Sequence, residues 1–388
     1  MRKFFTSESV TSGHPDKICD RVSDAVLDAY LAQDPYSRVA CECSATRNYM
    51  LIMGEVTSKA NVDAESIARK VIRETGYDFD GSSFTSFGTE IVVKLNRQSP
   101  DIAQGVDNAF GSERSSDAFD KTGAGDQGIM FGYATDETRE FMPLTLVLSH
   151  KLCLKLEEVR KNGTLKYLRP DGKGQVTVEY DNGVPKRVDA VVLSSQHDGN
   201  IDTETLRSDL KKYVIDSVIP AGFIDANTKF FINPTGRFEI GGPEGDSGLT
   251  GRKIIVDTYG GKAPHGGGAF SGKDPTKVDR SATYMARYIA KNVVAAGLAK
   301  ECLLQISYAI GVARPLSVYV NTFGTGRIAD DKLAEVISSE FDLRPAAIIE
   351  TLKLRSPVYY RTASYGHFGR DGFSWEKTDR VNDLKKYL

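Results

Sequence analysis

Residues 266–281 have the sequence GGGAFSGKDPTKVDRS, in which a glycine-rich loop leads into a charged helix start. Gly267–Lys273 fits the G-x-x-x-x-G-K spacing of a phosphate-binding loop, with a strand pattern before it and a helix pattern after it. That loop type requires Ser or Thr next, whereas this chain has Asp274 and Pro275, which are typical of a helix N-cap and first turn. We therefore exclude a Walker-type loop and expect a helix N-terminus with two cations and a candidate metal ligand: Lys273, Lys277 and Asp279.

A second loop, Gly241–Lys253, is rich in glycine and ends in the cations Arg252 and Lys253. Glycine lets the backbone approach a ligand closely, and two cations at the loop exit favour an anionic ligand. The alternative is a multi-turn loop that ends in a solvated basic pair. The density of glycine favours the functional interpretation.

The segment His14-Pro15-Asp16-Lys17 predicts the start of the first helix. A phosphate is favoured at this position for two reasons. The first backbone N–H groups of a helix have no intrahelical partners, and the positive end of the helix dipole lies there. His14 could donate a hydrogen bond to a leaving oxygen, Asp16 could hold Mg²⁺, and Lys17 could pair with an anion. The same residue types are also ordinary helix-start chemistry, so the segment by itself leaves both interpretations open.

Several carboxylates stand outside these segments: Glu8, Glu42, Glu55 and Asp126. Glu42 is expected on the strand face opposite Cys41 and Cys43, so it is either solvated or a cation ligand. His197 and His265 have no ligand-like partners nearby in the sequence, and we expect each to be structural or solvated.

Helical and strand-like patterns alternate along the whole chain. The predicted helices are 15–33, 62–75, about 142–161, about 203–217, one that opens at Asp274-Pro275, and two near 330–340 and 344–353. The predicted strands are 38–46, 50–57, 91–95, 129–133, 175–180, 186–193, 229–233, 253–259, 302–310 and 315–321. Gly76 predicts a helix C-cap, and Asn182-Gly183 predicts a hairpin turn.

This alternation predicts an α+β (mixed α/β) fold built from three units. We expect an N-terminal αβ domain at 1–100, a central αβ domain at 122–238 and a C-terminal αβ domain at 239–388. Residues 101–121 lose periodicity and are rich in Ser, Asp and Gly, which predicts a mobile active-site loop or linker.

The composition limits the class of protein. The 388 residues are 40% hydrophobic and 26% charged, which excludes a disordered, collagen-like or disulfide-stapled chain. With 50 Lys and Arg against 52 Asp and Glu, the net charge is −2, so binding to nucleic acid or anionic lipid is not expected. Five cysteines without a CxxC pair support neither a disulfide framework nor a zinc site. Because no signal-peptide or membrane-helix pattern occurs, we expect a cytoplasmic protein.

Taken together, the motifs resemble the S-adenosylmethionine synthetase (methionine adenosyltransferase) family over nearly the whole chain. Besides the three segments described above, the resemblance rests on Gln98-Ser99-Pro100-Asp101-Ile102, Gly123-Ala124-Gly125-Asp126-Gln127-Gly128, Leu168-Arg169-Pro170-Asp171-Gly172-Lys173 and Gly236-Arg237-Phe238. The chain departs from the family pattern at Ser12, where Glu is usual, and over Cys43–Met50.

The resemblance implies structurally similar αβ domains in a pseudo-threefold arrangement. It implies a homodimer or homotetramer with active sites at the interface between subunits. The reaction it implies joins ATP and L-methionine, with Mg²⁺ and K⁺ as cofactors, to give S-adenosylmethionine. In that reaction the methionine sulfur attacks C5′ of ATP, and the expelled triphosphate is hydrolysed to phosphate and pyrophosphate.

Carried over position by position, the resemblance also implies roles for single residues. The implied catalytic residues are His14 at the departing triphosphate and the phosphate-binding cations Lys173, Arg252, Lys253, Lys273 and Lys277. Further implied ATP contacts are Asp171, Arg237, Phe238, Asp246 and Ala269. The implied methionine contacts are Glu55, Gln98, Asp126, Asp246 and Lys277. The implied metal ligands are Asp16 and Asp279 for Mg²⁺ and Glu42 for K⁺.

The residues alone leave two other functional classes to consider. An ATP-dependent kinase or ligase would use the same loops, but it would transfer a phosphoryl group or form an adenylate. A regulatory nucleotide-binding module would bind without turnover. The broken Walker pattern argues against the first class, and the dispersed cations and carboxylates argue against the second.

Overall fold

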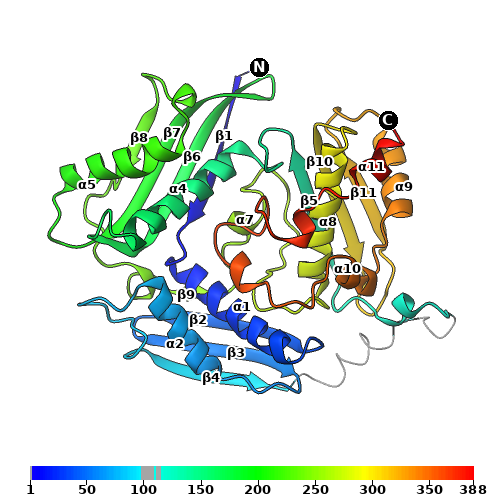
Figure 1. Cartoon of the computed structure of the whole chain (residues 1–388), viewed down its shortest axis with the longest axis horizontal. Helices are drawn as coiled ribbons and strands as arrows, with labels where there is room; N and C mark the ends of the chain where they lie inside the picture. Colours follow the sequence, from blue (N-terminus) through cyan, green and yellow to red (C-terminus); the bar gives the residue numbers. More distant parts are fainter. Residues whose placement is uncertain (1, 98–108, 111–114) are drawn as a thin grey trace.

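The computed structural model describes residues 2–97, 109–110 and 115–388, which fold into three sheets with helices packed on them (Figure 1). The mixture of helices and sheets confirms the α+β fold class. None of the described helices is both long and apolar enough to cross a membrane.

The first sheet has the strand order β4-β3-β2-β9 and lies under helices α1 and α2 (Figure 1). Helix α2 ends at Gly76, whose φ of 100° confirms the predicted C-cap. The bounds are α1 Pro15–Gln33, α2 Ala64–Thr75, β2 Arg38–Thr46, β3 Tyr49–Thr57, β4 Glu90–Asn96 and β9 Gly248–Leu249.

The second sheet has the order β1-β6-β7-β8, with helices α4 and α5 beside it (Figure 1). The turn between β6 and β7 has φ of 50° at Asn182 and 82° at Gly183, as the predicted hairpin requires. The bounds are β1 Arg2–Val10, β6 Leu168–Asp181, β7 Val184–His197, β8 Lys229–Ile232, α4 Leu144–Lys161, α5 Thr203–Leu210 and α6 Asp216–Val218.

The third sheet has the order β11-β10-β5, and α8 packs across it (Figure 1). The short helix α7 lies near the middle of the molecule in the same view. The bounds are β5 Gly128–Thr135, β10 Glu301–Tyr308, β11 Ser317–Asn321, α7 Ile254–Asp257, α8 Val278–Ala295, α9 Asp330–Glu340, α10 Pro345–Thr351 and α11 Val381–Lys385.

The sheets exchange strands between distant parts of the sequence. The N-terminal β1 pairs with β6 of the second sheet, β5 pairs with β10 of the third, and β9 pairs with β2 of the first. The buried apolar side chains of the first and third sheets form one continuous core, while the second sheet has its own. The division into residues 1–100, 122–238 and 239–388 stays a prediction, because each sheet takes a strand from outside its range.

Two element predictions are wrong. Residues 253–259 are predicted as a strand, but Ile254–Asp257 is a helical turn whose Asp257 side chain binds the buried Lys17. Helix α8 begins at Val278 rather than at Asp274-Pro275, and the Asp274 carboxylate accepts both the N–H of Thr276 (3.0 Å) in a local turn and the N–H of Val39 in β2 (2.8 Å). The helix predicted at about 203–217 is present as a continuous run of α5, a π turn at Lys211–Ile215 and α6.

Candidate active site

His14 immediately precedes α1 and is 3% exposed. Its Nδ1 accepts a hydrogen bond from the backbone N–H of Asp16 (3.2 Å). Burial, and then the charge of Lys253, lower the pKa of His14 from 6.5 to about 3. The ring is therefore neutral at pH 7, and because Nδ1 is an acceptor its proton is on Nε2. His14 thus offers Nε2–H as a hydrogen-bond donor without carrying a charge.

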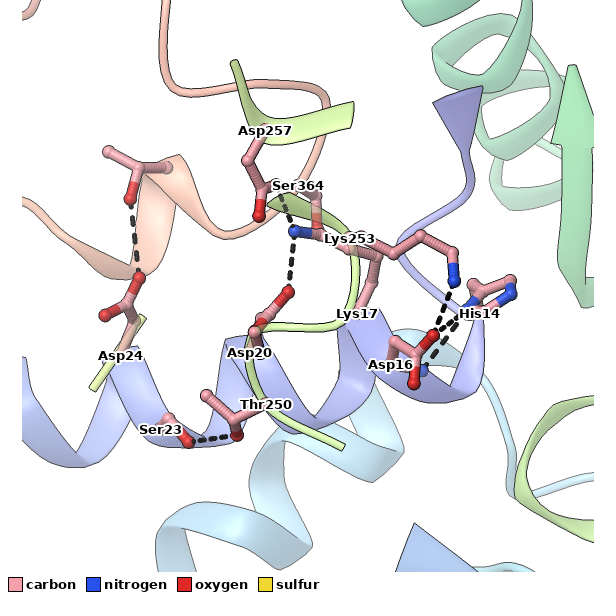
Figure 2. Close-up of polar contacts among 12 residues, drawn as sticks. His14, Asp16, Lys17, Asp20, Ser23, Asp24, Thr250, Lys253, Asp257 and Ser364 are labelled. Carbon is pink, nitrogen blue, oxygen red and sulfur yellow. Dashed lines mark hydrogen bonds and ion pairs between the residues drawn. The ribbon is translucent and has the colours of Figure 1, made fainter. Parts of the chain in front are cut away.

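Cations from three separate segments lie around His14. The Nζ of Lys253 is 2.6 Å from Oδ2 of Asp16 (Figure 2), and the Arg252 guanidinium is 3.9 Å from Oδ1 of the same carboxylate. Burial opposes ionisation of Asp16, but the hydrogen bond from Lys253 holds its pKa below the usual value. Lys173 of β6 is exposed, and its charge also lowers the pKa of His14. We name His14, Asp16, Lys173, Arg252 and Lys253 the His14 cluster.

Lys17 does not belong to this cluster, which corrects the suggestion that it pairs with an anionic ligand. Its side chain is 1% exposed, and Nζ lies between Oδ2 of Asp20 (2.8 Å) and Oδ1 of Asp257 (2.5 Å) (Figure 2). With two carboxylates in direct contact, this ammonium neutralises buried charge inside the protein.

Asp246 lies in the glycine-rich loop Gly241–Lys253, and Asp171 of β6 binds this loop. Asp171 is buried and its Oδ2 accepts the N–H of Gly242 (2.8 Å), and burial raises the pKa of Asp171 to about 6. Asp246 is exposed, and its backbone N–H donates to the carbonyl of Gly242 (3.1 Å). Asp171 thus binds the backbone of this loop, and its contact with ATP stays a prediction.

Phe238 and Arg237 lie where this loop leaves the second sheet. The N–H of Phe238 donates to Nε2 of His197 (3.1 Å), which gives His197 the structural role that we expected. Arg237 is exposed and pairs with Glu239 (2.5 Å). His197 therefore fixes the backbone of a residue that is predicted to contact the nucleoside.

The glycine-rich loop at residues 266–273 brings another set of charges together at the start of α8. The Nζ of Lys273 is 2.6 Å from Oδ2 of Asp279, and Lys277 pairs with the buried Asp274. The two lysine side chains are 24% and 16% exposed, so both remain reachable. We name Lys273, Asp274, Lys277 and Asp279 the Lys273 cluster.

Asp126 lies close to this cluster through its neighbour Gly125. A Cβ added to Gly125 would lie 2.7 Å from the carbonyl oxygen of Thr276 and 3.7 Å from Cα of Lys277. Only glycine allows this approach, which brings the exposed Asp126 to the same end of α8 as Lys277.

Glu55 and Glu42 approach the same cluster across the first sheet. Ala40 of β2 forms a bridge to Lys273 and pairs with Glu55 of β3. Glu42 lies two residues further along β2, on the same face as Ala40, and is exposed. Three of the predicted methionine contacts, Glu55, Asp126 and Lys277, therefore gather around Lys273. Gln98 and the predicted lid lie mostly outside the described residues.

The two clusters adjoin without bonding to each other. A Cβ added to Gly251 would lie 2.4 Å from Cβ of Ala269, so the two glycine-rich loops are in contact there. Among the residues that the structure describes, no hydrogen bond or ion pair joins the His14 cluster to the Lys273 cluster. The loops that carry both clusters are instead bound to helix α1, through Asp20 and Asp24.

The carboxylates predicted to hold Mg²⁺ suit a metal that is shared with phosphate. The described ranges contain no group of three or more His, Cys, Asp or Glu side chains that could hold a metal without other ligands. Mg²⁺ is commonly bound by one or two carboxylates together with substrate phosphates. Asp16 and Asp279 fit this pattern, and a Cβ on Gly268 would lie 2.2 Å from the Asp279 carboxyl carbon, so glycine leaves room beside that carboxylate.

The K⁺ site predicted at Glu42 stays a prediction. Alkali cations are held by several oxygen ligands together. Glu42 supplies one carboxylate on an exposed strand face.

Sequence reasoning missed two residues that shape the site, Asp20 and Asp24. Asp20 accepts the N–H of Gly251 (2.8 Å), and Asp24 accepts the N–H of Gly272 (2.8 Å). A signal was present in the sequence, because Asp recurs every fourth residue from 16 to 28 and so occupies one face of the predicted helix.

The chain is similar to known proteins over nearly its whole length. Three family models match the chain in order: the N-terminal domain of S-adenosylmethionine synthetase at residues 2–100, the central domain at 121–238 and the C-terminal domain at 240–377. The chain is 54% identical over 391 residues to the S-adenosylmethionine synthase of Clostridium botulinum (strain Alaska E43 / Type E3), covering 100% of both chains. It is 57% identical over 388 residues to the S-adenosylmethionine synthase of Finegoldia magna (strain ATCC 29328 / DSM 20472 / WAL 2508), covering 99% of both.

Proposed function

The chain belongs to the S-adenosylmethionine synthetase family, and from this premise we propose how its residues would make S-adenosylmethionine from ATP and L-methionine. The enzyme class is methionine adenosyltransferase. In the proposed reaction the methionine sulfur attacks C5′ of ATP and the C5′–O bond breaks. The triphosphate leaves with the bonding electron pair and is then hydrolysed to phosphate and pyrophosphate.

The buried ring of His14, whose Nδ1 accepts the N–H of Asp16, is the observation that carries this proposal. A triphosphate leaving from C5′ develops negative charge on the oxygen that bridges to the sugar. A donor held in a water-poor site stabilises such a charge, and mutagenesis of comparable donors costs roughly 10²–10³ in kcat. Nε2–H of His14 is such a donor, because Nδ1 is already occupied by the Asp16 N–H. An imidazole whose pKa is about 3 keeps this role unchanged across neutral pH.

The cations of both clusters would bind the phosphate chain. Lys173 and Arg252 are exposed beside His14, and Lys253 needs only to exchange Asp16 for a phosphate oxygen. Lys273 is likewise paired with Asp279 and would exchange it for a phosphate oxygen. Each lysine is thus held by a carboxylate that is itself a predicted Mg²⁺ ligand. Binding of a metal–phosphate pair would replace both ion pairs together.

Asp16 and Asp279 are the residues that would hold Mg²⁺. When bound, Mg²⁺ would neutralise phosphate charge as a Lewis acid. The chain's own contribution is to place one predicted Mg²⁺ ligand in each cluster, at the starts of α1 and α8.

Among the described residues no hydrogen bond or ion pair joins the two clusters, which supports a site shared between subunits. Lys173, Arg252 and Lys253 accompany His14, whereas Glu55, Asp126 and Lys277 gather around Lys273. We propose that the His14 cluster of one subunit faces the Lys273 cluster of a second copy in a homodimer or homotetramer. A site that takes its contacts from two chains in this way would be active only in an oligomer.

Product analysis tests the proposed reaction. The protein is incubated with ATP, L-methionine, Mg²⁺ and K⁺ in water enriched in ¹⁸O, and all products are identified by mass. We expect S-adenosylmethionine together with phosphate and pyrophosphate, with one ¹⁸O atom in the phosphate products and none in the adenosyl product. ADP or AMP as the nucleoside product would overturn the proposal and favour a kinase or ligase. Binding of ATP without any product would favour a regulatory module.

A further inference from the structure

Helix α1 carries a row of four aspartates that bind backbone N–H groups of distant loops. Residues four apart lie on the same face of a helix, so the four carboxylates form one stripe. The pairs, in order along the helix, are Asp16 with Leu249 (3.0 Å), Asp20 with Gly251 (2.8 Å), Asp24 with Gly272 (2.8 Å) and Asp28 with Tyr359 and Tyr360 (3.0 and 2.8 Å). Figure 2 shows Asp16, Asp20 and Asp24 following one another along the helix.

Two of these contacts stand directly before the cations of the site. Gly251 precedes Arg252, and Gly272 precedes Lys273. Each aspartate therefore fixes the backbone one residue before a predicted phosphate-binding side chain. Gly272 has a φ of 79°, and a Cβ added there would lie 1.8 Å from the carbonyl oxygen of Cys41, so the loop can take this path only with glycine.

Asp24 holds its loop from two sides. Its carboxylate forms two hydrogen bonds to Arg280 (2.7 and 2.9 Å), and both side chains are completely buried. Arg280 in turn donates to the carbonyl oxygens of Phe270 (2.9 Å) and Lys273 (3.3 Å). Arg280 thus binds carbonyls that lie before and after Gly272 in the sequence. Its partner Asp24 accepts the N–H of Gly272 itself.

Asp20 holds the other loop through a buried cluster of its own. Its Oδ1 accepts the N–H of Gly251, and its Oδ2 binds Lys17, which also binds Asp257 in α7. Burial raises the pKa of Asp20, and Lys17 opposes that shift. Gly251 lies before Arg252-Lys253 in the sequence and Asp257 lies after them. Both are therefore bound to the same turn of α1, through Asp20 and Lys17.

We propose that Asp20 and Asp24 are positioning residues that each fix one phosphate-binding loop on helix α1. Because each loop is bound to a rigid helix, its cations are already placed for the triphosphate that they contact. A displacement of about 1 Å in such a group can cost on the order of 10² in rate. The inference rests on the proposed function, in which these cations bind ATP.

The chain supplies a matched control on the same stripe. Asp28 also accepts backbone N–H groups, but its partners Tyr359 and Tyr360 lie in a segment without any predicted site residue. The variants Asp20→Asn, Asp24→Asn and Asp28→Asn remove one negative charge each from α1 and keep side-chain size. In each variant the new side-chain NH₂ group faces a hydrogen-bond donor in place of one carboxylate oxygen. One of the contacts that the aspartate makes is therefore lost.

The experiment measures S-adenosylmethionine formation and hydrolysis of inorganic tripolyphosphate by each full-length variant, beside its urea midpoint. We expect Asp20→Asn and Asp24→Asn to lower kcat for both reactions 10- to 100-fold, with KM for methionine changed less than about 3-fold. Asp28→Asn should lower the urea midpoint while leaving both kcat values within about 3-fold, since its contacts are structural. An equal kcat loss in all three variants would overturn the proposal, because it would show a general effect of destabilisation. Normal kcat in folded Asp24→Asn would overturn it as well.

A second variant keeps the proposal testable if Asp24→Asn does not fold. Gly272→Ala leaves the Asp24–Arg280 pair intact but forces the loop away from Cys41. We expect the same selective loss of kcat, and unchanged kcat would contradict positioning through this loop. The wild-type assay separates the two hypotheses: no S-adenosylmethionine from wild type contradicts the proposed function, whereas active wild type with fully active variants contradicts only the positioning role.

Discussion

Oδ2 of Asp16 and Nζ of Lys253 lie 2.6 Å apart, on a carboxylate that is 3% exposed. The two residues come from positions more than two hundred residues apart in the sequence. The lysine therefore has a carboxylate partner at the place where a phosphate is expected. The same relation holds between Lys273 and Asp279.

Asp16→Asn should raise the Mg²⁺ concentration needed for half-maximal activity by at least about 10-fold. The reason is the loss of one anionic ligand, since Mg²⁺ prefers carboxylate over amide oxygen. The amide oxygen can still accept the N–H of Leu249, so the melting temperature should change little. Activity is measured against Mg²⁺ concentration, with the exposed Asp331→Asn as control. Identical Mg²⁺ curves for Asp16→Asn and wild type would remove Asp16 from the metal site.

The activity of the wild type should show no ionisation that belongs to His14 between pH 5.5 and 9. Burial and Lys253 lower the pKa of this ring to about 3, so it is neutral throughout that range. His14→Ala should lower kcat about 10²–10³-fold without changing the shape of the profile. The test is kcat/KM against pH for both proteins. An acidic limb near pH 6.5 that disappears in the variant would contradict a neutral His14.

The same histidine should make folding stability depend on pH. Its folded pKa is below the unfolded value of 6.5, so between pH 6.5 and about 3 the unfolded chain binds a proton that the folded chain does not. The stability that neutral His14 contributes is complete above pH 6.5 and declines as the pH falls. The stability of wild type relative to His14→Gln should therefore fall by about 2 kcal/mol from pH 7 to pH 5. Urea unfolding at the two pH values measures this, and a constant difference would refute the shift.

Lys273→Ala should lower kcat about 100-fold and leave the fold intact. Its Nζ binds Asp279 at the surface of the site and is 24% exposed, so no deeply buried charge loses its partner. Lys70→Ala, which removes a solvated lysine on α2, is the control. Steady-state kinetics and circular dichroism are compared for both variants. Near-normal turnover of Lys273→Ala would remove this lysine from the phosphate contacts.

Glu376→Gln should lower the free energy of unfolding by about 3 kcal/mol. Both oxygens of Glu376 are bound to Arg287 (2.9 and 3.0 Å), and one is also bound to Lys291 (2.7 Å), all within the core. Loss of the carboxylate leaves two buried cations without a counter-charge. The exposed pair of Lys332 and Glu335 offers the control Glu335→Gln, which should change stability by less than about 0.5 kcal/mol. Equal urea midpoints for the two variants would contradict this account.

Elements whose hydrogen bonds close within a few residues were predictable. Helix α1 begins at Pro15 as expected, Gly76 ends α2, and Asn182-Gly183 forms the hairpin turn. The failures occurred where side chains from elsewhere compete for local groups. Asp274 accepts the local N–H of Thr276 as a capping residue would, but its other carboxylate oxygen accepts the N–H of Val39 from β2, and the helix begins only at Val278. Lys17 had the chemistry of an anion-binding lysine, but Asp20 and Asp257 surround it.

The family, the fold class and the chemical types of the site residues were determined by the sequence itself, because motifs such as residues 266–281 carry them locally. The tertiary structure decided which of those residues meet. It divided them into the His14 cluster and the Lys273 cluster, placed Lys17 in the interior, and bound both loops to the aspartates of α1. The physical reason is that a buried charge must find its partner wherever packing brings one, and packing depends on the whole chain. Local sequence therefore determines what a side chain can do, and burial determines whether it remains available to a ligand.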